Sequence, residues 1–180
     1  YYEGSLDLLA PGLFQYYQAV LDGICSFYPR LAHFWECSPF ACCCFNLRPR
    51  VWAFIHTDHF NIPFGWCSIT ALGRFCPQRS GHLILWDWGL IIDFPHGSTI
   101  YIPSALVQHS NIPVQAHETR FSIVQWMPGP LCLWFDYGFR SSKSFLAEHG
   151  KAKVADANAA HWAEGLKLLS KLRDFHQHGQ

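Results

Sequence analysis

Two short stretches of the chain contain residue types that could hold a metal ion together. His56 and Asp58 stand two positions apart in HTDHFNIPFGW, directly after the strand-like run VWAFI, and His109 stands near the end of the β-rich run ALVQHSN. Residues i and i+2 of an extended segment point to one face, so we expect His56 and Asp58 to project together. Two imidazoles and one carboxylate are the ligand set of non-haem Fe(II) oxygenases, and they leave positions open on the metal.

A second pair of residues could bind an organic anion beside the metal. Arg120 and Ser122 stand at i and i+2 in the run TRFSIVQW, again on one face. The open metal positions could take the keto-acid end of 2-oxoglutarate and O₂, and the far carboxylate would then need a planar cationic fork and a hydroxyl. Taken singly, each residue has an ordinary alternative: Asp58 could cap a turn, and Arg120 could pair with Glu118. The order and spacing of the whole set favour a site.

Two further residues could contact a substrate. Asn61 follows Asp58 by three positions, and its amide offers both a hydrogen-bond donor and an acceptor. Trp126 lies at even spacing from Arg120, so we expect its indole on the same face, where it could stack on a planar substrate. The alternative is that Asn61 only closes its turn and that Trp126 belongs to the core.

The composition indicates one well-packed domain. The chain has 180 residues, 50% of them hydrophobic, with 8 Trp and 15 Phe, which is enough for a single core. Thirteen basic residues balance thirteen acidic ones, so a nucleic-acid partner would have to be bound by a local patch. No apolar run approaches the roughly 20 residues that span a bilayer, so we expect no membrane partner. Because the chain begins with Tyr1 rather than Met, we expect a fragment or an excised domain.

Three zones differ in their periodicity. Residues 1–36 form a helical flank, in which residues 12–34 carry apolar side chains at helical spacing. Residues 37–140 contain eight or nine short β-rich runs, from ACCCFNL to LCLWF, cut by Gly, Pro and Asn, which suggests a sandwich or barrel. Residues 154–175 return to helical spacing, with basic residues toward the end.

The eight cysteines do not predict a metal site or disulfides. Cys37 and the run Cys42, Cys43 and Cys44 contain no C-x-x-C pair, and no second pair follows at zinc-ribbon spacing. We therefore expect small, buried, reduced thiols of an intracellular protein.

Three segments of the chain resemble one enzyme family. These are HTDHFNIPFGWCSITALG, in which His, Asp, Asn and Gly recur in a set order, then GHLILWDWGLIIDFPHGSTIYIPSALVQHSNIPV, and WFDYGFR. They resemble the TET/JBP branch of the 2-oxoglutarate- and Fe(II)-dependent dioxygenases, in particular the set found in mushroom-forming fungi, often near transposons. The resemblance covers about residues 37–140.

This resemblance implies a fold, a site and an activity. The fold would be a mainly β double-stranded β-helix (a jelly roll, cupin-like) with flanking N- and C-terminal helices, forming a single domain over residues 1–180. Fe(II) would be held by His56, Asp58 and His109, with Arg120 on 2-oxoglutarate and O₂ as the oxidant. The protein would be a nuclear enzyme that oxidises a methylated base in DNA, 5-methylcytosine. Asn61 would then read the base edge, and Trp126 would stack on a base flipped from the duplex. We also expect a monomer.

Other functions remain open at this point. The DNA-modifying relatives place a His eight residues past the Arg, where this chain has Pro128. The same chemistry could act on another base, a protein side chain or a small molecule. A third possibility is a transposon-derived domain that binds nucleic acid without turnover.

Overall fold

The computed structural model describes residues 4–33, 35 and 38–171 of the chain, which form two compact units. One unit is Cys42–Gly129, and the other joins Tyr1–Ala41 with Pro130–Gln180. The first is a β structure and the second is helical. None of the described helices is long and apolar enough to cross a bilayer.

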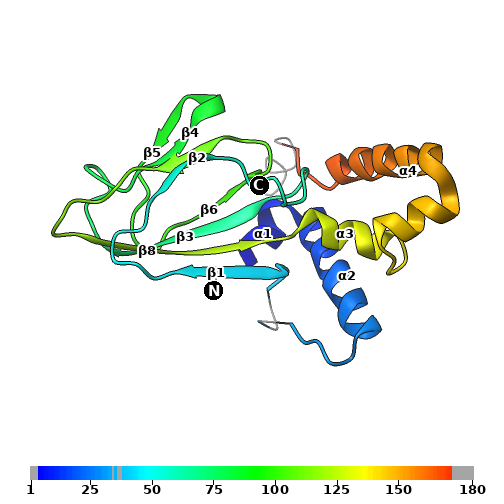
Figure 1. The fold of residues 1–180 in the computed structure, drawn as a ribbon. Helices are drawn as coiled ribbons and strands as arrows, with labels where there is room; N and C mark the ends of the chain where they lie inside the picture. Colours follow the sequence, from blue (N-terminus) through cyan, green and yellow to red (C-terminus); the bar gives the residue numbers. More distant parts are fainter. Residues whose placement is uncertain (1–3, 34, 36–37, 172–180) are drawn as a thin grey trace, which may run out of the picture. The chain divides into compact units, whose positions relative to one another are not determined.

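The β unit has eight described strands in two four-stranded antiparallel sheets. The strands are β1 (Cys42–Asn46), β2 (Ala53–His56), β3 (Cys67–Arg74), β4 (Leu83–Leu85), β5 (Leu90–Ile92), β6 (Thr99–Ile102), β7 (His109–Asn111) and β8 (Thr119–Trp126). The sheet orders are β1-β8-β3-β6 and β2-β7-β4-β5. In Figure 1 the first sheet lies below the second.

This strand order is that of a double-stranded β-helix. The chain pairs β1 with β8, β2 with β7, β3 with β6 and β4 with β5, so nested strand pairs alternate between the two sheets. The result is a jelly roll, in which two sheets enclose one interior. The predicted mainly β fold, with helices before and after it in the sequence, is confirmed.

The closed part of the interior is apolar. Its buried side chains come from both sheets and from the loops between them: Cys67, Ile69, Ala71, Leu83, Leu85, Phe94, Ile102 and Val107. They follow the period-2 alternation of the strands, which places every second residue inside. This packed region holds the strands in register around the remaining space between the sheets.

A glycine allows the close approach of β3 to β8. Gly73 has a φ of +121°, a conformation that L side chains rarely adopt, and it pairs in register with Arg120. A Cβ atom at this position would press on the carbonyl oxygen of Thr119. The absence of a side chain at residue 73 therefore allows the backbone of β8 to pack closely against β3 at Arg120.

The helical unit contains four described helices, α1 (Gly4–Leu9), α2 (Pro11–Phe27), α3 (Gly129–Asp136) and α4 (Ser142–Lys167). Helix α2 confirms the helix predicted within residues 12–34, with Pro11 at its start and Leu13, Tyr17, Val20, Leu21 and Ile24 buried. Ser141 caps α4 by accepting a hydrogen bond from the Ser144 amide.

Two expectations about this unit were wrong in detail. The run LCLWF, predicted as a strand, lies in helix α3, because a short apolar run fits a buried strand and a buried helix equally well. Helix α4 begins at Ser142, well before the predicted residue 154, and has a kink at Gly150, whose φ is +77°. Its first half is mostly polar and carries no helical apolar period. The predicted end of the C-terminal helix, residues 172–175, lies outside the described residues.

Candidate metal centre

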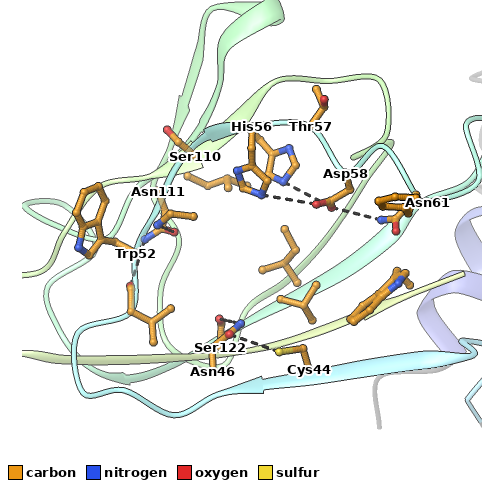
Figure 2. Close-up of a pocket in the computed structure, with 18 of the residues that line it drawn as sticks. Cys44, Asn46, Trp52, His56, Thr57, Asp58, Asn61, Ser110, Asn111 and Ser122 are labelled. Carbon is orange, nitrogen blue, oxygen red and sulfur yellow. Dashed lines mark hydrogen bonds and ion pairs between the residues drawn. The ribbon is translucent and has the colours of Figure 1, made fainter. Parts of the chain in front are cut away.

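Three side chains converge at one end of the space between the sheets. His56 Nε2 lies 3.6 Å from Asp58 Oδ1, and His109 Nε2 lies 3.9 Å from Asp58 Oδ2. The two imidazole rings are 4.3 Å apart between centroids, and one possible ligand atom of each residue lies within 4.8 Å of the others. Figure 2 shows His56 and Asp58 turned toward one another. This group could hold a metal ion, and it is the only such group of three or more His, Cys, Asp or Glu side chains among the described residues.

Both histidines have the tautomer that a metal requires. His56 Nδ1 lies 2.7 Å from the carbonyl oxygen of Phe54, and His109 Nδ1 lies 2.9 Å from that of Val107. A carbonyl only accepts, so each Nδ1 carries a proton, and Nε2 is the nitrogen of each ring that can bind a metal. Metal-bound histidines typically donate their second nitrogen to a carbonyl in this way. The two Nε2 atoms face the carboxylate of Asp58, where an ion would sit.

Burial keeps His109 neutral. The ring is almost fully inside the unit, and this burial, together with the neighbouring His56, lowers the pKa of His109 below its ordinary value. The hydrogen bond to Val107 O and the charge of Asp58 raise the pKa of His109, and each has a smaller effect than burial. A neutral imidazole is the form that binds metal, so the site favours ligation at neutral pH.

A β-bulge, and not simple strand alternation, brings His56 into the site. Ala53 pairs with Asn111 and His56 with His109, so β2 has one residue more than β7 between the two pairs. The extra residue reverses the side to which the next side chain points. His56 therefore lies opposite His109, while Ile55 is exposed.

Asp58 lies in the turn after β2 rather than in the strand. Its amide donates to Ser104 O at 2.8 Å, and the Asn61 amide donates to Asp58 O at 2.9 Å. The side-chain nitrogen of Asn61 donates to Asp58 Oδ2 at 3.3 Å (Figure 2). It also donates to Ser104 Oγ at 2.9 Å. A carboxylate only accepts, so the orientation of the Asn61 amide is fixed. Asn61 thus supports Asp58, and its Oδ1 is left as an acceptor.

Arg120 is a buried cation without a carboxylate partner. Its side chain is 2% exposed, Nη1 donates to Val51 O at 3.3 Å, and Nε has no partner in the part of the chain that the structure describes. Burial alone lowers the pKa of Arg120 to about 10, so it still carries its charge at neutral pH. Arg120 lines the same pocket as the three possible metal ligands. An unpaired buried charge is unfavourable, and an anion in the pocket would relieve it.

Glu118 does not neutralise Arg120. The Glu118 carboxylate accepts hydrogen bonds from Ser80 Oγ at 2.5 Å, from the Cys76 amide at 2.8 Å and from the Gln115 amide at 2.9 Å. These contacts lower the pKa of Glu118 to about 2. The ion pair with Arg120 that the sequence allowed as an alternative is absent from the structure.

Ser122 is prepared to donate to a ligand. Asn46, at the end of β1, lies opposite Ser122, and its side-chain nitrogen donates to Ser122 Oγ at 3.1 Å (Figure 2). Because the hydroxyl oxygen already accepts this bond, its own proton is free to point at an acceptor in the pocket. Arg120 and Ser122 both line that pocket, as their spacing predicted.

One pocket of about 580 Å³ joins these residues. Its volume is typical of pockets that take small molecules, roughly 300–1,000 Å³. Arg120, Ser122, Val124 and Trp126 line it from β8, so the alternation predicted for this strand is confirmed. The indole of Trp126 also packs against the core cluster between the sheets. The pocket therefore contains a possible metal group, a buried cation and an aromatic wall.

Two asparagines of the site could not be identified from the sequence. Asn46 orients Ser122. Asn111 binds the backbone of the β2 side through its side chain, beside the bulge: its Oδ1 accepts from the Ala53 amide at 3.0 Å, and its Nδ2 donates to Val51 O at 3.3 Å. The only sequence signal is their spacing: Asn46 shares the face of Cys44, and Asn111 lies two residues past His109.

The loop with Pro128 pairs with the turn that carries Asn61, and residue 128 offers no hydrogen-bond donor. Asn61 forms an isolated bridge with Pro128, the Ile62 amide donates to Met127 O at 3.0 Å, and the Gly129 amide donates to Phe60 O at 2.8 Å. Proline has no amide hydrogen and no polar side chain, so a base in the pocket would find no hydrogen-bond donor at this position.

The described cysteines are free thiols with different exposures. Cys67 and Cys132 are buried, and burial raises the pKa of each thiol to about 12, which keeps them protonated. Cys44 is exposed and lines the metal pocket, contrary to the expectation of a buried thiol. Cys37 lies outside the described residues.

Comparisons with known proteins give limited similarity. No family model matches the chain, and no curated protein matches it. A solved structure, NgTET1 in complex with 5mC DNA, aligns with a TM-score of 0.45 and 16% sequence identity, over 58% of this chain and 41% of that chain. The chain thus spans less than half of the length of that protein. At this level of similarity, the chemistry of the chain must be deduced from its own side chains.

Proposed function

We propose that the chain is an Fe(II)- and 2-oxoglutarate-dependent dioxygenase that oxidises a methyl group on a nucleobase, with 5-methylcytosine in DNA as the substrate. One observation carries the proposal: a two-histidine, one-carboxylate group and a buried, unpaired arginine line the same pocket. The first is the ligand set of non-haem Fe(II) oxygenases. The second is what the far carboxylate of a keto-diacid requires.

Different residues of the pocket would bind the metal and the cosubstrate. His56, Asp58 and His109 would hold the metal, and their hydrogen bonds to backbone carbonyls and to Asn61 fix their orientation. Arg120 would bind the far carboxylate of 2-oxoglutarate. When bound, Fe(II) would supply activation of O₂ for hydroxylation of the methyl group, while 2-oxoglutarate is converted to succinate and CO₂.

Ser122 completes the proposed carboxylate site. Its hydroxyl proton is free because Asn46 already donates to its oxygen, so it would donate to the carboxylate beside Arg120. The two residues are held by neighbouring positions of one strand, β8, which limits their relative movement.

The choice of a cytosine rests on the proposed base pocket. Both hydrogens of the Asn61 amide have acceptors within the protein, which leaves Oδ1 to accept a hydrogen bond. An acceptor at this position suits the exocyclic amino group of cytosine and not the O4 carbonyl of thymine. Trp126 would stack on the base, since it forms a wall of the same pocket. The resemblance of HTDHFNIPFGWCSITALG to the TET/JBP dioxygenases supports the same substrate class.

The same oxidation of another substrate is the second candidate. Pro128 favours it, because this position offers no polar group where the DNA-modifying relatives have a histidine. Another base, a protein side chain or a small molecule would then enter the pocket.

Metal binding is the first test. Titration of the metal-free protein with Mn²⁺, followed by calorimetry, should reveal one site, and Asp58→Ala should weaken it by at least about 100-fold, since even residues that only support a ligand contribute about 10–100-fold. Asp93→Ala is the matched control, because Asp93 is a half-exposed carboxylate just after β5 that pairs with His82 and is not one of the proposed ligands. Equal affinity of Asp58→Ala and the unaltered protein would exclude the assigned ligands.

Turnover is the second test. The protein with Fe(II) and 2-oxoglutarate should release succinate when a 5-methylcytosine oligonucleotide is added, and the product base should gain one oxygen by mass spectrometry. Succinate release that is unaffected by the methyl group would favour another substrate. Metal and 2-oxoglutarate binding without any succinate would indicate a domain that binds nucleic acid without turnover.

A further inference from the structure

A basic segment adjoins the metal pocket and has no assigned role in the proposed reaction. Arg48, Pro49 and Arg50 form an exposed turn between β1 and β2. Two surface hollows of about 460 and 420 Å³ flank this turn, and Arg48, Arg50 and Trp52 line both of them. Among the residues that the structure describes, no carboxylate lines either hollow. Their walls are therefore cationic and aromatic.

The two arginines are available to an outside anion. Neither forms an ion pair within the described ranges of the chain, in contrast with Arg140, which pairs with Glu148. The chain has no net charge, so this local excess of positive charge is a feature of the turn and not of the whole protein. Two guanidinium groups that face the same hollow suit phosphate oxygens, because each presents a planar fork of donors.

An aromatic pair continues from the arginines toward the metal. Trp52 is 44% exposed and Phe54 is 77% exposed, and their rings meet edge to face with centroids 4.5 Å apart. Trp52 also lines the metal pocket, so one side chain forms a wall of all three spaces. In Figure 2 its indole lies at the side of the pocket away from Asn61. Exposed aromatic faces of this kind can stack on unpaired bases.

Backbone hydrogen bonds hold the turn against the strand that carries Arg120. The Arg120 amide donates to Pro49 O at 2.7 Å, and the Val51 amide donates to Arg120 O at 3.1 Å. Arg50 therefore has a fixed place beside β8. From Arg50 to His56 the chain covers at most about 20 Å at a strand's rise per residue, a distance that a few nucleotides of an extended strand can span.

We propose that Arg48, Arg50 and Trp52 form a binding site for single-stranded DNA next to the target base, with the arginines on backbone phosphates and Trp52 stacked on a neighbouring base. This proposal rests on the proposed function, because it assumes that a base of the same strand enters the metal pocket. It adds that the strand is bound unpaired, since a base inside a duplex has no free face for Trp52 to stack on.

The test is a binding assay that needs neither Fe(II) nor turnover. Fluorescence anisotropy would measure the affinity of a labelled single-stranded oligonucleotide containing one 5-methylcytosine, over a range of salt concentrations. The double variant Arg48→Glu/Arg50→Glu should lose at least about tenfold in affinity. Its plot of log K against log salt concentration should become shallower by about 1.4, because each phosphate contact to a single strand contributes about 0.7.

A matched control separates a local site from the effect of net charge. Lys151→Glu/Lys153→Glu makes the same change in charge at the same spacing on helix α4, in the other unit, and should alter the affinity less than about twofold. Trp52→Ala should weaken binding by about tenfold with the salt dependence unchanged, and Trp52→Phe should recover most of that loss. Thermal unfolding would verify that every variant is folded.

Three results would overturn the proposal. The first is an equal loss of affinity in the arginine and lysine variants, and the second is unchanged binding in Trp52→Ala. The third is loss of 2-oxoglutarate binding in Arg48→Glu/Arg50→Glu with strand binding intact, which would assign the arginines to the cosubstrate. Strand binding that depends on Arg48 and Arg50, combined with no oxidation of methylated DNA, would contradict the proposed function and leave this site standing.

Discussion

Replacing Arg120 by methionine should stabilise the ligand-free protein and abolish its response to 2-oxoglutarate. Arg120 is 2% exposed and has no carboxylate partner among the described residues, and burial lowers the pKa of its guanidinium to about 10. Each pKa unit corresponds to about 1.4 kcal/mol, so burial of this charge opposes folding by about 3 kcal/mol. Methionine removes the charge and keeps an unbranched side chain of comparable length in the interior.

One favourable contact is lost in the same change. Arg120 Nη1 donates to Val51 O at 3.3 Å, and a hydrogen bond of this kind contributes about 1 kcal/mol. Asn111 Nδ2 still donates to Val51 O, so the carbonyl keeps a partner. The net expectation is a gain of about 1–2 kcal/mol in the free energy of unfolding of the ligand-free protein, in the range seen when buried ions are replaced by apolar residues.

The assay is urea unfolding with and without 2-oxoglutarate, in the presence of Mn²⁺. A ligand at about 100 times its dissociation constant should raise the free energy of unfolding of the unaltered protein by about 2.7 kcal/mol. The increase should vanish in Arg120→Met. Arg74→Met is the matched control, because Arg74 is an exposed arginine at the end of β3, and it should keep the full ligand response.

The reasoning would be refuted by either of two results. A loss of several kcal/mol in ligand-free Arg120→Met would mean that the guanidinium stabilises the fold through contacts other than the single bond to Val51. An unchanged response to 2-oxoglutarate would mean that the far carboxylate binds elsewhere in the pocket.

Three further predictions concern neighbouring parts of the β unit. The pKa of Glu118 is lowered from its ordinary value near 4.5 to about 2, so the charged carboxylate stabilises the fold above pH 4.5 and this contribution is lost as the pH falls toward 2. Glu118→Gln should therefore make the melting temperature depend less on pH over that interval. A pH profile parallel to that of the unaltered protein would contradict this. Asn46→Ala should raise the KM for 2-oxoglutarate several-fold with little change in protein stability, since it frees Ser122 to rotate; an unaltered KM would show that Ser122 needs no orienting partner. Gly73→Ala should lower the free energy of unfolding by about 1–3 kcal/mol in a denaturant titration, because a φ of +121° is strained for alanine and the added Cβ would press on Thr119 O. A loss below about 0.5 kcal/mol would mean that the backbone adapts.

Some features of the site could be predicted from residue types and spacing alone. Arg120, Ser122 and Trp126 share a face of β8 because side chains alternate along any strand, and this holds whatever the strand pairs with. The chemistry of His56, Asp58 and His109 also followed from their donor atoms, which do not change with the fold. The many short runs cut by Gly and Pro predicted a β structure, and the two four-stranded sheets confirm it.

The pairing of distant segments decided the rest. By alternation from Ala53, Ile55 would face inward and His56 outward, but the bulge opposite His109 and Asn111 reverses this, and a bulge depends on the register with a partner strand. Asp58 reaches the metal group only through a turn tied to Ser104, and Ser122 is oriented by Asn46, 76 positions away in sequence. The run LCLWF could form a helix or a strand until tertiary packing selected the helix. Local sequence determines side-chain chemistry and periodicity. Strand register, the bulge and the burial of Arg120 without a carboxylate partner among the described residues depend on contacts between residues far apart in the chain, and these contacts exist only in the folded protein.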